Sequence, residues 1–552
     1  MANEYKSPLA IFYEWEKSIP NKVYFHQPIA GRSLEFTWQQ TGDQIRRMAA
    51  ALKAMNLPEK SKIGIVSKNC AHWIMSDLAI MMSGHISVPI YPNVSDKTIN
   101  YVLSHSEAQV LFVGKLDDWA SMKPGVPDDV HCISFPTYYG DTGYEQWDDI
   151  INQHEPLSGS PDRDPNDIMT IIYTSGTTGT PKGVVHTFHA FSYAANNALA
   201  GGIIDVGKPN GRFFSYLPLS HIAERMLIGM GGVYTGSEVF FAESLDTFAK
   251  NLSEAKPTVF LAVPRIWTKF QMGILSKMPQ NRLDLLLKVP FLSTFIKRKI
   301  RKGLGLDDAL HCLTGAAPTP PSLMKWFEKL GIKIQEVYGM TENCAYSHYT
   351  RKSNIQYGST GQPMPHVDCI ISDIGEILVK SEANMVGYYK EPEKSAASFQ
   401  DEYLRTGDKG SIDANGFLTI TGRVKDIFKT AKGKYVAPAP IELKLNVNTN
   451  IEQVCIVGVN LPQTMALIVL SEEAAKGDKQ EIADSLAETV NAVNATLDKH
   501  EKIKKAVVLK EPWTIENDLM TPTLKIKRDP LENKFKDHYE QWYNNGGLVV
   551  WE

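Results

Sequence analysis

One stretch combines glycines, hydroxyls and a cation directly after an apolar run. The residues from Tyr173 to Val185 read YTSGTTGTPKGVV. Glycine lets backbone N–H groups approach an anion closely, and hydroxyl and ammonium groups add donors, so this composition suits a polyphosphate. The alternative is a flexible surface loop, although such loops rarely follow a fully apolar strand directly. The candidate phosphate-binding residues are Thr174, Ser175, Gly176, Thr177, Thr178, Gly179 and Lys182.

The stretch is not a Walker A loop. That motif needs Gly-Lys-Ser/Thr, whereas Lys182 stands between Pro181 and Gly183. P-loop kinases and GTPases are therefore disfavoured.

The same stretch resembles the phosphate-binding signature of the AMP-forming adenylating enzymes, the superfamily of acyl-CoA synthetases, nonribosomal-peptide adenylation domains and firefly luciferases. Further segments resemble the remaining signatures of this superfamily, in the expected order. They are LPLSH (217–221), TGAAP (314–318), YGMTE (338–342), YLRTGD (403–408), GRVKD (422–426), KGKYVAP (432–438) and TPTLKIKR (521–528). The resemblance spans essentially the whole chain and implies ATP, Mg²⁺ and CoA as the cofactor and co-substrates.

The residues that match the nucleotide-binding motifs suit the parts of ATP. Tyr338 offers a ring face for adenine, and the small residues from Gly315 to Pro318, with Ala316 and Ala317 between them, offer a wall on which a flat base can lie. Gly339 follows the tyrosine. Asp408 can accept both hydroxyl protons of a ribose diol, and Arg423 can support the same ribose.

Two further residues match the family positions around the α-phosphate. Thr341 is expected to hydrogen-bond the α-phosphate, and Glu342 is a hard oxygen ligand suited to Mg²⁺. The resemblance adds Thr178 as a second metal-side residue. His221 follows a Pro-Leu-Ser turn, where an isolated histidine is usually structural, but the family position borders the substrate carboxylate.

The C-terminal part carries the residues that the resemblance assigns to movement. Lys525 matches the lysine that reaches the α-phosphate and the carboxylate during adenylation, and Lys425 matches the pivot between two lobes. The resemblance implies an N-terminal adenylate-forming domain over residues 1–424 and a mobile C-terminal domain over residues 425–552. A CoA-side loop is expected at Lys432, Gly433 and Lys434.

The carboxylic acid substrate is inferred only from the resemblance of sequence motifs to one branch of the superfamily. The LPLSH, GRVKD and TPTLKIKR regions resemble long-chain fatty acyl-CoA synthetases, in which leucine replaces the usual glycine before Lys525. The expected function is ATP-dependent activation of a medium- to long-chain fatty acid followed by transfer to CoA. The alternatives are transfer to a carrier-protein thiol, a luciferase-like oxygenase, and a noncatalytic nucleotide-sensing scaffold. Trp267 suits either an acyl channel or the core.

The elements that must position these residues alternate between short apolar runs and longer helical patterns. Runs that are apolar at every position indicate strands buried on both faces, so the alternation predicts α/β architecture with parallel sheets. The predicted strands lie at 62–66, 109–114, 167–174, 258–263 and 311–315, and the predicted helices at 37–56 and 189–202. His186 and His189 are both interpreted as helix residues.

The pattern changes after about residue 365. Short strand-like pieces at 370–381 and 410–423 predict a small antiparallel, barrel-like layer. Beyond Asp426, strands at 454–459 and 466–471, a long helix at 481–502 and a closing strand at 506–510 predict a compact α+β domain.

The amino-acid composition excludes several classes of protein. The 552 residues carry 58 Lys and Arg against 62 Asp and Glu, a formal net charge of −4, which disfavours a nucleic-acid binder. The six cysteines form no CxxC pair, so neither a zinc site nor a disulfide framework is indicated. The N-terminus lacks the apolar core of a signal peptide. A cytoplasmic enzyme, or one peripheral at a membrane surface, is expected.

One basic segment bears on the peripheral alternative. Over residues 291–302, apolar residues at helical spacing precede five cations in six positions. This pattern suits an amphipathic element at an anionic membrane, and equally a helix with a core face and a solvated basic end.

Overall fold

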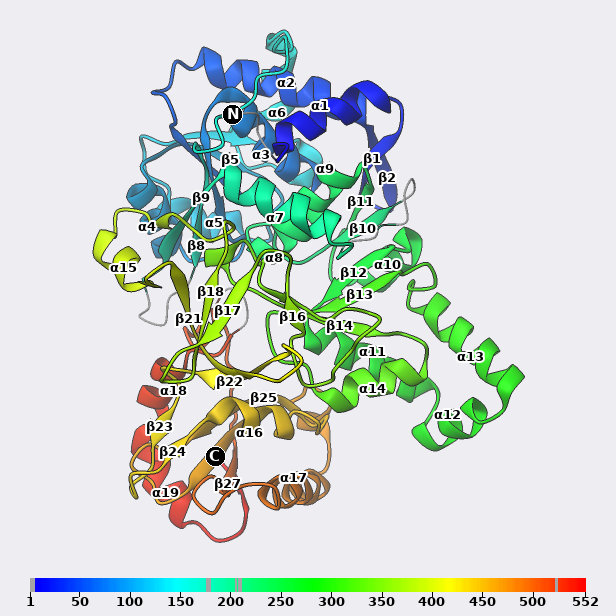
Figure 1. Cartoon of the computed structure of the whole chain (residues 1–552), viewed down its shortest axis with the longest axis vertical. Coiled ribbons are helices and arrows are strands. Elements are labelled where there is room, and N and C mark those ends of the chain that lie inside the picture. Colours follow the sequence, from blue (N-terminus) through cyan, green and yellow to red (C-terminus); the bar gives the residue numbers. More distant parts are fainter. Residues whose placement is uncertain (1–4, 175–179, 204–205, 207–210, 522–524) are drawn as a thin grey trace.

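The computed structural model describes residues 5–174, 180–203, 206, 211–521 and 525–552. Figure 1 shows a large N-terminal lobe with a smaller C-terminal domain below it. Strands and helices alternate through the N-terminal lobe, and most of its neighbouring strands run parallel. The predicted α/β class is confirmed.

An eight-stranded sheet carries the phosphate-loop stretch at one edge. Strands β3 to β8 pair in parallel, whereas β9 runs antiparallel to β8, and β19 antiparallel to β9. In sheet order the strands are β19 (Gly387–Tyr388), β9 (Lys182–Thr187), β8 (Ile168–Thr174), β4 (Ile86–Ile90), β3 (Lys62–Val66), β5 (Ala108–Val113), β6 (His131–Ser134) and β7 (Glu145–Gln146).

A nine-stranded sheet forms the second layer. Its six central strands are parallel, and antiparallel strands close both edges. In sheet order they are β16 (Gln362–Pro363), β15 (His348–Tyr349), β14 (Ile334–Tyr338), β13 (His311–Thr314), β12 (Val259–Ala262), β10 (Arg212–Ser215), β11 (Glu238–Phe241), β1 (Val23–Ile29) and β2 (Arg32–Thr37).

Helices pack on these sheets according to their apolar faces. Helix α3 (Ala71–Ser83) is buried along its whole length, which explains why its sequence is apolar nearly all round. Helix α2 (Trp38–Ala54) begins at a capping box between Thr37 and Gln40. The remaining helices of this lobe are α1 (Pro8–Ser18), α4 (Asp96–Ser106), α5 (Trp119–Met122), α6 (Trp147–Gln153), α7 (Phe188–Ala200), α8 (Ile222–Glu224), α9 (Gly231–Thr235), α10 (Phe248–Ala255), α11 (Pro264–Lys277), α12 (Gln280–Leu287), α13 (Pro290–Gly303), α14 (Pro321–Lys329) and α15 (Pro392–Ala397).

The predicted antiparallel layer is a five-stranded sheet between the lobe and the C-terminal domain. Its order is β17-β18-β21-β20, and β22 pairs with β21. The strands are β17 (Asp368–Ile371), β18 (Glu376–Lys380), β20 (Phe399–Gln400), β21 (Tyr403–Ile412) and β22 (Leu418–Arg423).

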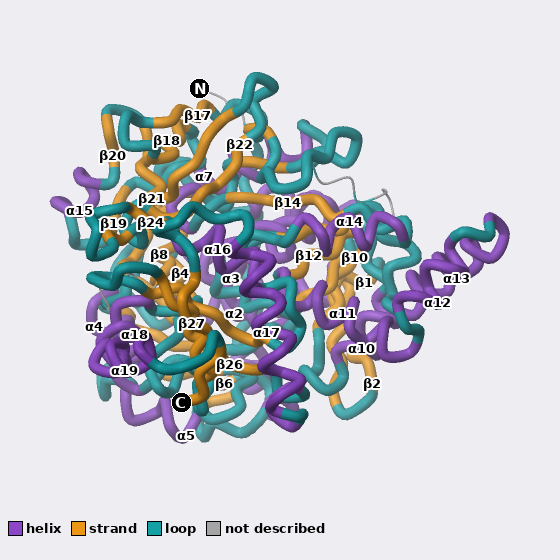
Figure 2. Tube along the Cα trace, turned by 90° about the horizontal axis from the view of Figure 1, so that it is seen from below, coloured by secondary structure: helices purple, strands orange, loops and turns teal. Residues whose placement is uncertain are grey.

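The C-terminal domain is a four-stranded sheet with helices on it, seen from below in Figure 2. The predicted helix over 481–502 is too long, because α17 ends at Asn494, whose side-chain amide bonds both the N–H and the C=O of Ile503 and turns the chain into the next strand. The elements are β23 (Phe428–Lys429), β24 (Tyr435–Val436), α16 (Pro438–Leu445), β25 (Ile451–Val457), β26 (Thr464–Leu470), α17 (Lys479–Asn494), β27 (Ile503–Val508), α18 (Arg528–Phe535), α19 (Tyr539–Asn544) and β28 (Val549–Trp551).

The two alternatives for Trp267 are decided by packing. Trp267 is fully buried, packs against Phe260 and Phe327, and donates to the carbonyl of Leu313, so it belongs to the core. Within the described ranges, no helix combines the length and the hydrophobicity needed to cross a bilayer.

Candidate active site

The site is built where parallel strands of the nine-stranded sheet end. Strands β10, β13 and β14 end at Ser215, Thr314 and Tyr338, and the loops that follow carry the LPLSH, TGAAP and YGMTE motifs. Carboxyl ends of parallel strands meet at one edge of a sheet, the usual position of a binding crevice in α/β proteins. The fold therefore brings together motifs that are more than 100 residues apart.

Tyr338, Asp408 and Arg423 form one cluster. The Tyr338 hydroxyl donates to Asp408 Oδ2 at 2.7 Å, and Arg423 Nε pairs with Asp408 Oδ1 at 2.9 Å. Asp408 and Arg423 are direct cross-strand partners on β21 and β22. Burial, with the charge of Asp408, raises the pKa of Tyr338 well above its usual range, so the phenol stays protonated and remains a donor.

The small-residue wall beside Tyr338 is fixed by close backbone approach. A side chain at Gly315 would lie 2.8 Å from the Val337 side chain, so only glycine fits there. Ala316 takes φ +65°, a left-handed conformation, and it is exposed together with Ala317 and Pro318. This exposed ledge of small side chains matches the wall predicted for a flat base.

A buried carboxyl group supports that wall from beneath. Glu336 accepts from the Thr319 backbone N–H at 3.3 Å, and burial raises its pKa to about 8. The Thr314 and Thr319 hydroxyls hydrogen-bond at 2.9 Å across the base of the turn. Sequence reasoning missed Glu336, because the contact joins two motifs that the chain separates.

The turn after Tyr338 presents Thr341 and Glu342. Gly339 is required, since a side chain there would lie 2.5 Å from the backbone of Ala345. Thr341 is buried, and its carbonyl lies 2.6 Å from His186 Nε2. Glu342 Oε1 accepts from the Tyr388 hydroxyl at 2.8 Å.

His186 corrects the sequence interpretation. It lies in strand β9 and not in a helix, whereas His189 does lie in α7. The segment from Lys182 to Thr187 pairs antiparallel with β8, and this pairing overrides the helical pattern that begins after it. Burial lowers the pKa of His186 to about 4, so the ring is neutral and braces the Thr341 turn.

The ends of the phosphate-loop stretch lie in β8 and β9, which pair antiparallel. Thr174 and Lys182 face each other across the two strands, so Lys182 begins a strand and does not lie in the loop. The Lys182 ammonium lies 4.8 Å from the centre of the Tyr388 ring. The predicted loop residues Ser175, Gly176, Thr177, Thr178 and Gly179 lie outside the described residues.

Tyr388 links two predicted site residues and was missed by sequence reasoning. It lies in β19, which pairs with β9 through Tyr388 and Val184. Its ring contacts Lys182 and its hydroxyl contacts Glu342, so one aromatic side chain connects the residue predicted to bind phosphate with the residue predicted to bind the metal. The signal available was the GYYK segment at 387–390, which lies outside the predicted motifs.

His221 is held by a buried polar cluster. Its ring accepts from the Ala223 N–H at 3.2 Å as the N-cap of α8. Burial, with the nearby charge of Lys525, lowers the pKa of His221 to about 4, so the ring is neutral. Asn69 donates to the Leu217 carbonyl and accepts from the Leu219 N–H at 3.1 Å, which fixes the loop before the histidine.

Glu224 completes that cluster and was also missed. Its Oε1 accepts from the Ser215 hydroxyl and the Tyr216 N–H, each at 2.9 Å, and from Asn69. Burial raises the pKa of Glu224 to about 8, so it is protonated at neutral pH. A neutral, fully enclosed carboxyl group thus anchors the LPLSH loop to the end of β10.

Lys525 brings the C-terminal domain to this site. It lies within electrostatic range of His221, Glu342, Asp408 and Arg423. Desolvation and the charge of Arg423 lower the pKa of Lys525, and the two carboxylates oppose that shift. The backbone N–H of Thr521 donates to the Lys525 carbonyl at 2.8 Å, and the backbone N–H of Lys525 donates to the Thr521 hydroxyl at 3.1 Å.

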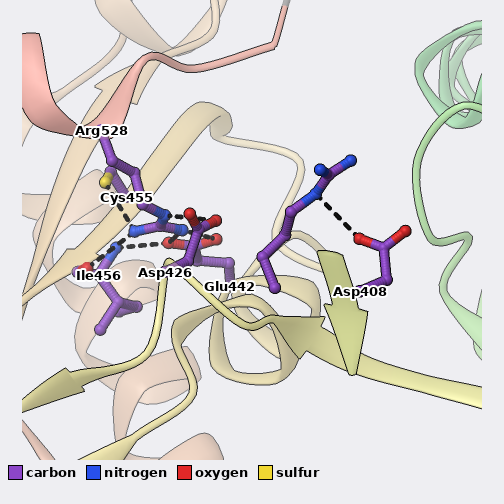
Figure 3. A network of polar contacts seen from close by, with 7 residues as sticks. Asp408, Asp426, Glu442, Cys455, Ile456 and Arg528 are labelled. Carbon is purple, nitrogen blue, oxygen red and sulfur yellow. Dashed lines mark hydrogen bonds and ion pairs between the residues drawn. The ribbon is translucent and has the colours of Figure 1, made fainter. Parts of the chain in front are cut away.

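An ion pair links the C-terminal domain to the N-terminal lobe, and further ion pairs lie within the C-terminal domain. Arg265 of α11 pairs with Glu452 of β25 across the two parts of the chain. Three residues beyond Lys525, Arg528 pairs with Glu442 and with Asp426, next to the predicted pivot (Figure 3). The segment that carries Lys525 is therefore tied directly to the turn that joins the domains.

Lys425 and the predicted CoA-side loop lie apart from these contacts. Lys425 is exposed in a turn after β22, where the Val424 N–H donates to the Gly407 carbonyl at 2.8 Å. Lys432, Gly433 and Lys434 are exposed at the tip of the β23–β24 hairpin, with Gly433 at φ +70°. The adjoining Ala431 N–H donates to Leu461, within the C-terminal domain.

The donor set suits a magnesium–nucleotide complex. In the described part of the chain, no group of three or more His, Cys, Asp or Glu side chains could hold a metal ion. Magnesium is usually bound by one or two carboxylates together with substrate phosphates and water, and Glu342 could supply such a carboxylate. The other ligands would come from ATP.

Comparisons with known proteins agree with this geometry. The profile described as AMP-binding enzyme matches residues 12–389, and that of the AMP-binding enzyme C-terminal domain matches residues 425–546. The chain is 29% identical over 589 residues to the long-chain-fatty-acid–CoA ligase FadD15 of Mycobacterium bovis, covering 98% of each protein. It is 26% identical to the long-chain-fatty-acid–CoA ligase ACSBG2 of Gallus gallus, covering 93% of this chain and 78% of that protein.

Solved structures share the fold. The anthranilate CoA ligase AuaEII, in complex with anthranoyl-AMP, superposes with a TM-score of 0.76 at 22% identity, covering 96% of this chain and 97% of the other. The adenylation domain of a carboxylate reductase from Mycobacterium chelonae gives a TM-score of 0.80 at 20% identity, covering 98% and 91%. The chain belongs to the AMP-binding enzyme family and is an AMP-forming acid–thiol ligase, of the kind that uses ATP, Mg²⁺ and CoA.

Proposed function

We propose that this ligase activates a medium- to long-chain fatty acid and transfers the acyl group to CoA. A carboxylate is a poor electrophile because it carries negative charge and has no good leaving group. Attack of the carboxylate on the α-phosphorus of ATP forms an acyl-adenylate and releases pyrophosphate. The thiol of CoA then attacks the acyl carbonyl, and AMP leaves.

The observation that carries this proposal is the position of Lys525 near Asp408 and Arg423, two members of the cluster with Tyr338. A cation near Asp408 and Glu342 can offset the negative charge that accumulates when the carboxylate meets the triphosphate. Lys182 adds a second cation on the phosphate side. In this assignment Thr341 hydrogen-bonds the α-phosphate and Glu342 holds Mg²⁺, which neutralises charge on the departing pyrophosphate.

The remaining side chains would bind the nucleotide and the acid. The Tyr338 ring and the wall at 315–318 would hold adenine, and Asp408 with Arg423 would hold the ribose. His221 would border the carboxylate as a neutral ring, which does not compete with Lys525 for the negative charge.

The second half-reaction calls for a different orientation of the C-terminal domain. In this proposal Lys525 lies on the side from which the thiol of CoA must approach. It lies there only in the orientation that serves adenylation. A turn centred on exposed Lys425 can reorient the domain, and the hairpin tip at 432–434 would then face the site for CoA. Residues 1–424 and 425–552 are the two bodies in this proposal.

The fatty-acid assignment is supported by the relatives. The two long-chain-fatty-acid–CoA ligases FadD15 match over 98% of this chain at 29% identity, and the long-chain-fatty-acid–CoA ligase ACSBG2 of Gallus gallus matches over 93% at 26% identity. A carrier-protein thiol is the second candidate acceptor, because neighbours with the same fold include an adenylation domain solved together with its carrier domain. Free CoA is preferred, since the more similar relatives are CoA ligases.

The test is a pyrophosphate-release assay with ATP and Mg²⁺ across saturated fatty acids of increasing chain length and a set of aryl acids, each with CoA, with a carrier protein, or with neither acceptor. The proposal expects release with fatty acids, AMP as the nucleotide product, and thioester only when CoA is present. Preference for aryl acids would overturn the substrate assignment. Thioester formation on a carrier protein but not on CoA would overturn the acceptor assignment.

A further inference from the structure

Helices α12 and α13 form an arm, residues 280–303, that stands away from the body of the molecule in both views (Figures 1 and 2). Large apolar side chains are exposed at its end. This apolar tip consists of Leu285, Val289, Phe291, Leu292 and Phe295. Phe291 is 93% exposed and Phe295 62% exposed, and the tip holds five of the fifteen exposed large hydrophobic residues in the described part of the chain.

The arm is a firmly packed element, so its apolar tip is not a product of loose structure. Leu283 and Ile296 are buried and join the core cluster around Trp326 and Phe327. The Trp326 indole donates to the Gln280 side chain at 2.8 Å, which fixes the start of α12. A packed helix pair that leaves aromatic rings in water indicates a binding surface for an apolar partner.

Charge identifies the partner. Between residues 280 and 303 there are seven Lys and Arg residues and one carboxylate, Asp284, although the whole chain is acidic. Lys288, Lys297 and Lys329 line an open notch beside the tip together with Asp284 and Leu287. An apolar tip surrounded by cations matches a layer of hydrocarbon beneath anionic headgroups.

Along α13, apolar side chains come before basic ones, and their separation matches the depth to which apolar groups enter a membrane surface. Phe291, Phe295, Arg298 and Lys302 follow one another at spacings of four, three and four, so they lie on one outer face of the helix. Ser293 and Ile296 face inward and are buried. Seven residues separate Phe291 from Arg298, about 10 Å along a helix, comparable to the depth that interfacial apolar faces reach.

We infer that the arm docks the enzyme on an anionic membrane, with the apolar tip inserted among the acyl chains and the cations of α13 on the lipid phosphates. The inference stands on the arm alone and goes beyond the proposed function. The arm lies in the chain between α11 and β13, whose carboxyl end leads into the wall at 315–318. Docking would thus place the lobe that carries the site at the layer into which fatty acids partition.

The test is flotation of the full chain with vesicles of neutral phosphatidylcholine alone or with a third of phosphatidylglycerol. Binding is expected on the anionic vesicles, and it should fall as salt increases. Two variants should each reduce it by about tenfold or more: Phe291→Ser with Phe295→Ser, and Arg298→Gln with Lys302→Gln. Matched controls are Leu245→Ser with Val447→Ser, and Lys17→Gln with Lys97→Gln, which change exposed residues elsewhere.

A fluorophore distinguishes insertion from surface attraction. An environment-sensitive label at Phe291→Cys should shift to shorter wavelength with anionic vesicles, whereas the same label at Leu245→Cys should not. Melting temperatures of all variants report whether they fold. The inference is overturned if arm and control variants bind vesicles equally, if no vesicle binding occurs, or if the tip variants dissociate an oligomer and leave vesicle binding unchanged.

Discussion

The hydroxyl of Tyr338 donates a 2.7 Å hydrogen bond to the carboxylate of Asp408. The hydrogen bond therefore fixes the ring proposed to bind adenine relative to the carboxylate proposed to bind ribose, although the two residues are 70 positions apart in the chain. Because Arg423 pairs with the other carboxylate oxygen, Asp408 is held on both sides before nucleotide binds. Its orientation is fixed by the protein and need not be selected by the ligand.

Tyr338→Phe should separate the ring from the hydrogen bond. The substitution keeps a face for adenine and removes the donor to Asp408. A hydrogen bond to a charged group contributes about 1.5–3 kcal/mol, so we expect the KM for ATP to rise by about tenfold or more, with kcat changed less. Tyr338→Ala, which removes the ring as well, should raise it further. An unchanged KM for ATP in the phenylalanine variant would show that Asp408 is held by Arg423 alone.

Glu224→Gln should alter the pH dependence of stability. Burial raises the pKa of Glu224 from 4.5 to about 8, so the folded state keeps a proton that the unfolded state releases between these values. The free energy of unfolding must fall as pH rises from about 4.5 to 8, by up to about 5 kcal/mol from this group. Glutamine can accept the same hydrogen bonds without titrating, so the variant should show a flatter curve in urea unfolding across this range.

The control for that measurement is Glu473→Gln, which changes an exposed glutamate and should leave the curve unaltered. Glu336 also has a pKa of about 8, so the variant should keep part of the slope. If the glutamine variant keeps the entire slope of the parent, Glu224 does not hold its proton in the folded state.

Sequence predicts a site residue when one short motif contains both the residue and the neighbours that suit it to a ligand. Glycines, hydroxyls and Lys182 after an apolar strand are of this kind, and so are the strands themselves, since a run buried on both faces is apolar throughout. The sequence pattern predicts a helix at His186 because its neighbours continue into one. The pairing of β9 with β8 decides its conformation, and that pairing is a long-range property.

The supporting residues could not be predicted in the same way. Glu224, Glu336 and Tyr388 each act by touching a residue that a different strand or loop delivers. From sequence alone, a single glutamate in a helix, such as Glu224, is interpreted as a solvated charge. Only the structure shows that it is buried. Sequence thus predicts the groups suited to contact the ligand, while the structure is needed to find the groups that hold them.

Lys525→Ala should suppress adenylation and spare the second half-reaction. The positive charge lies near Asp408 and Glu342 in the present orientation of the C-terminal domain, and in the proposed movement it would leave them. Loss of one such electrostatic group costs about a hundredfold or more in rate. We expect that loss in acid-dependent pyrophosphate release, with thioester formation from a supplied acyl-adenylate mostly intact. An equal loss in both assays, with an unchanged melting temperature, would mean that the lysine serves both steps.

Lys425 provides the sharpest test of the proposed domain movement. Its side chain is exposed in the turn after β22, so what matters in the proposal is the freedom of its φ and ψ angles. Proline fixes φ near −65° and biases Val424 toward extended conformations. Since the domain is docked with Lys525 at the site, Lys425→Pro should keep substantial pyrophosphate release and lose most CoA-dependent thioester formation.

The matched variant is Lys425→Ala, which removes the side chain and leaves the backbone free. It should impair neither half-reaction severely. Both variants keep the Val424 N–H that donates to Gly407, so the comparison tests the backbone freedom of residues 424 and 425 against the loss of the side chain. Alanine as damaging as proline in both half-reactions would mean that Lys425 acts through its ammonium group, and the pivot would then have to lie elsewhere in the turn between β22 and β23.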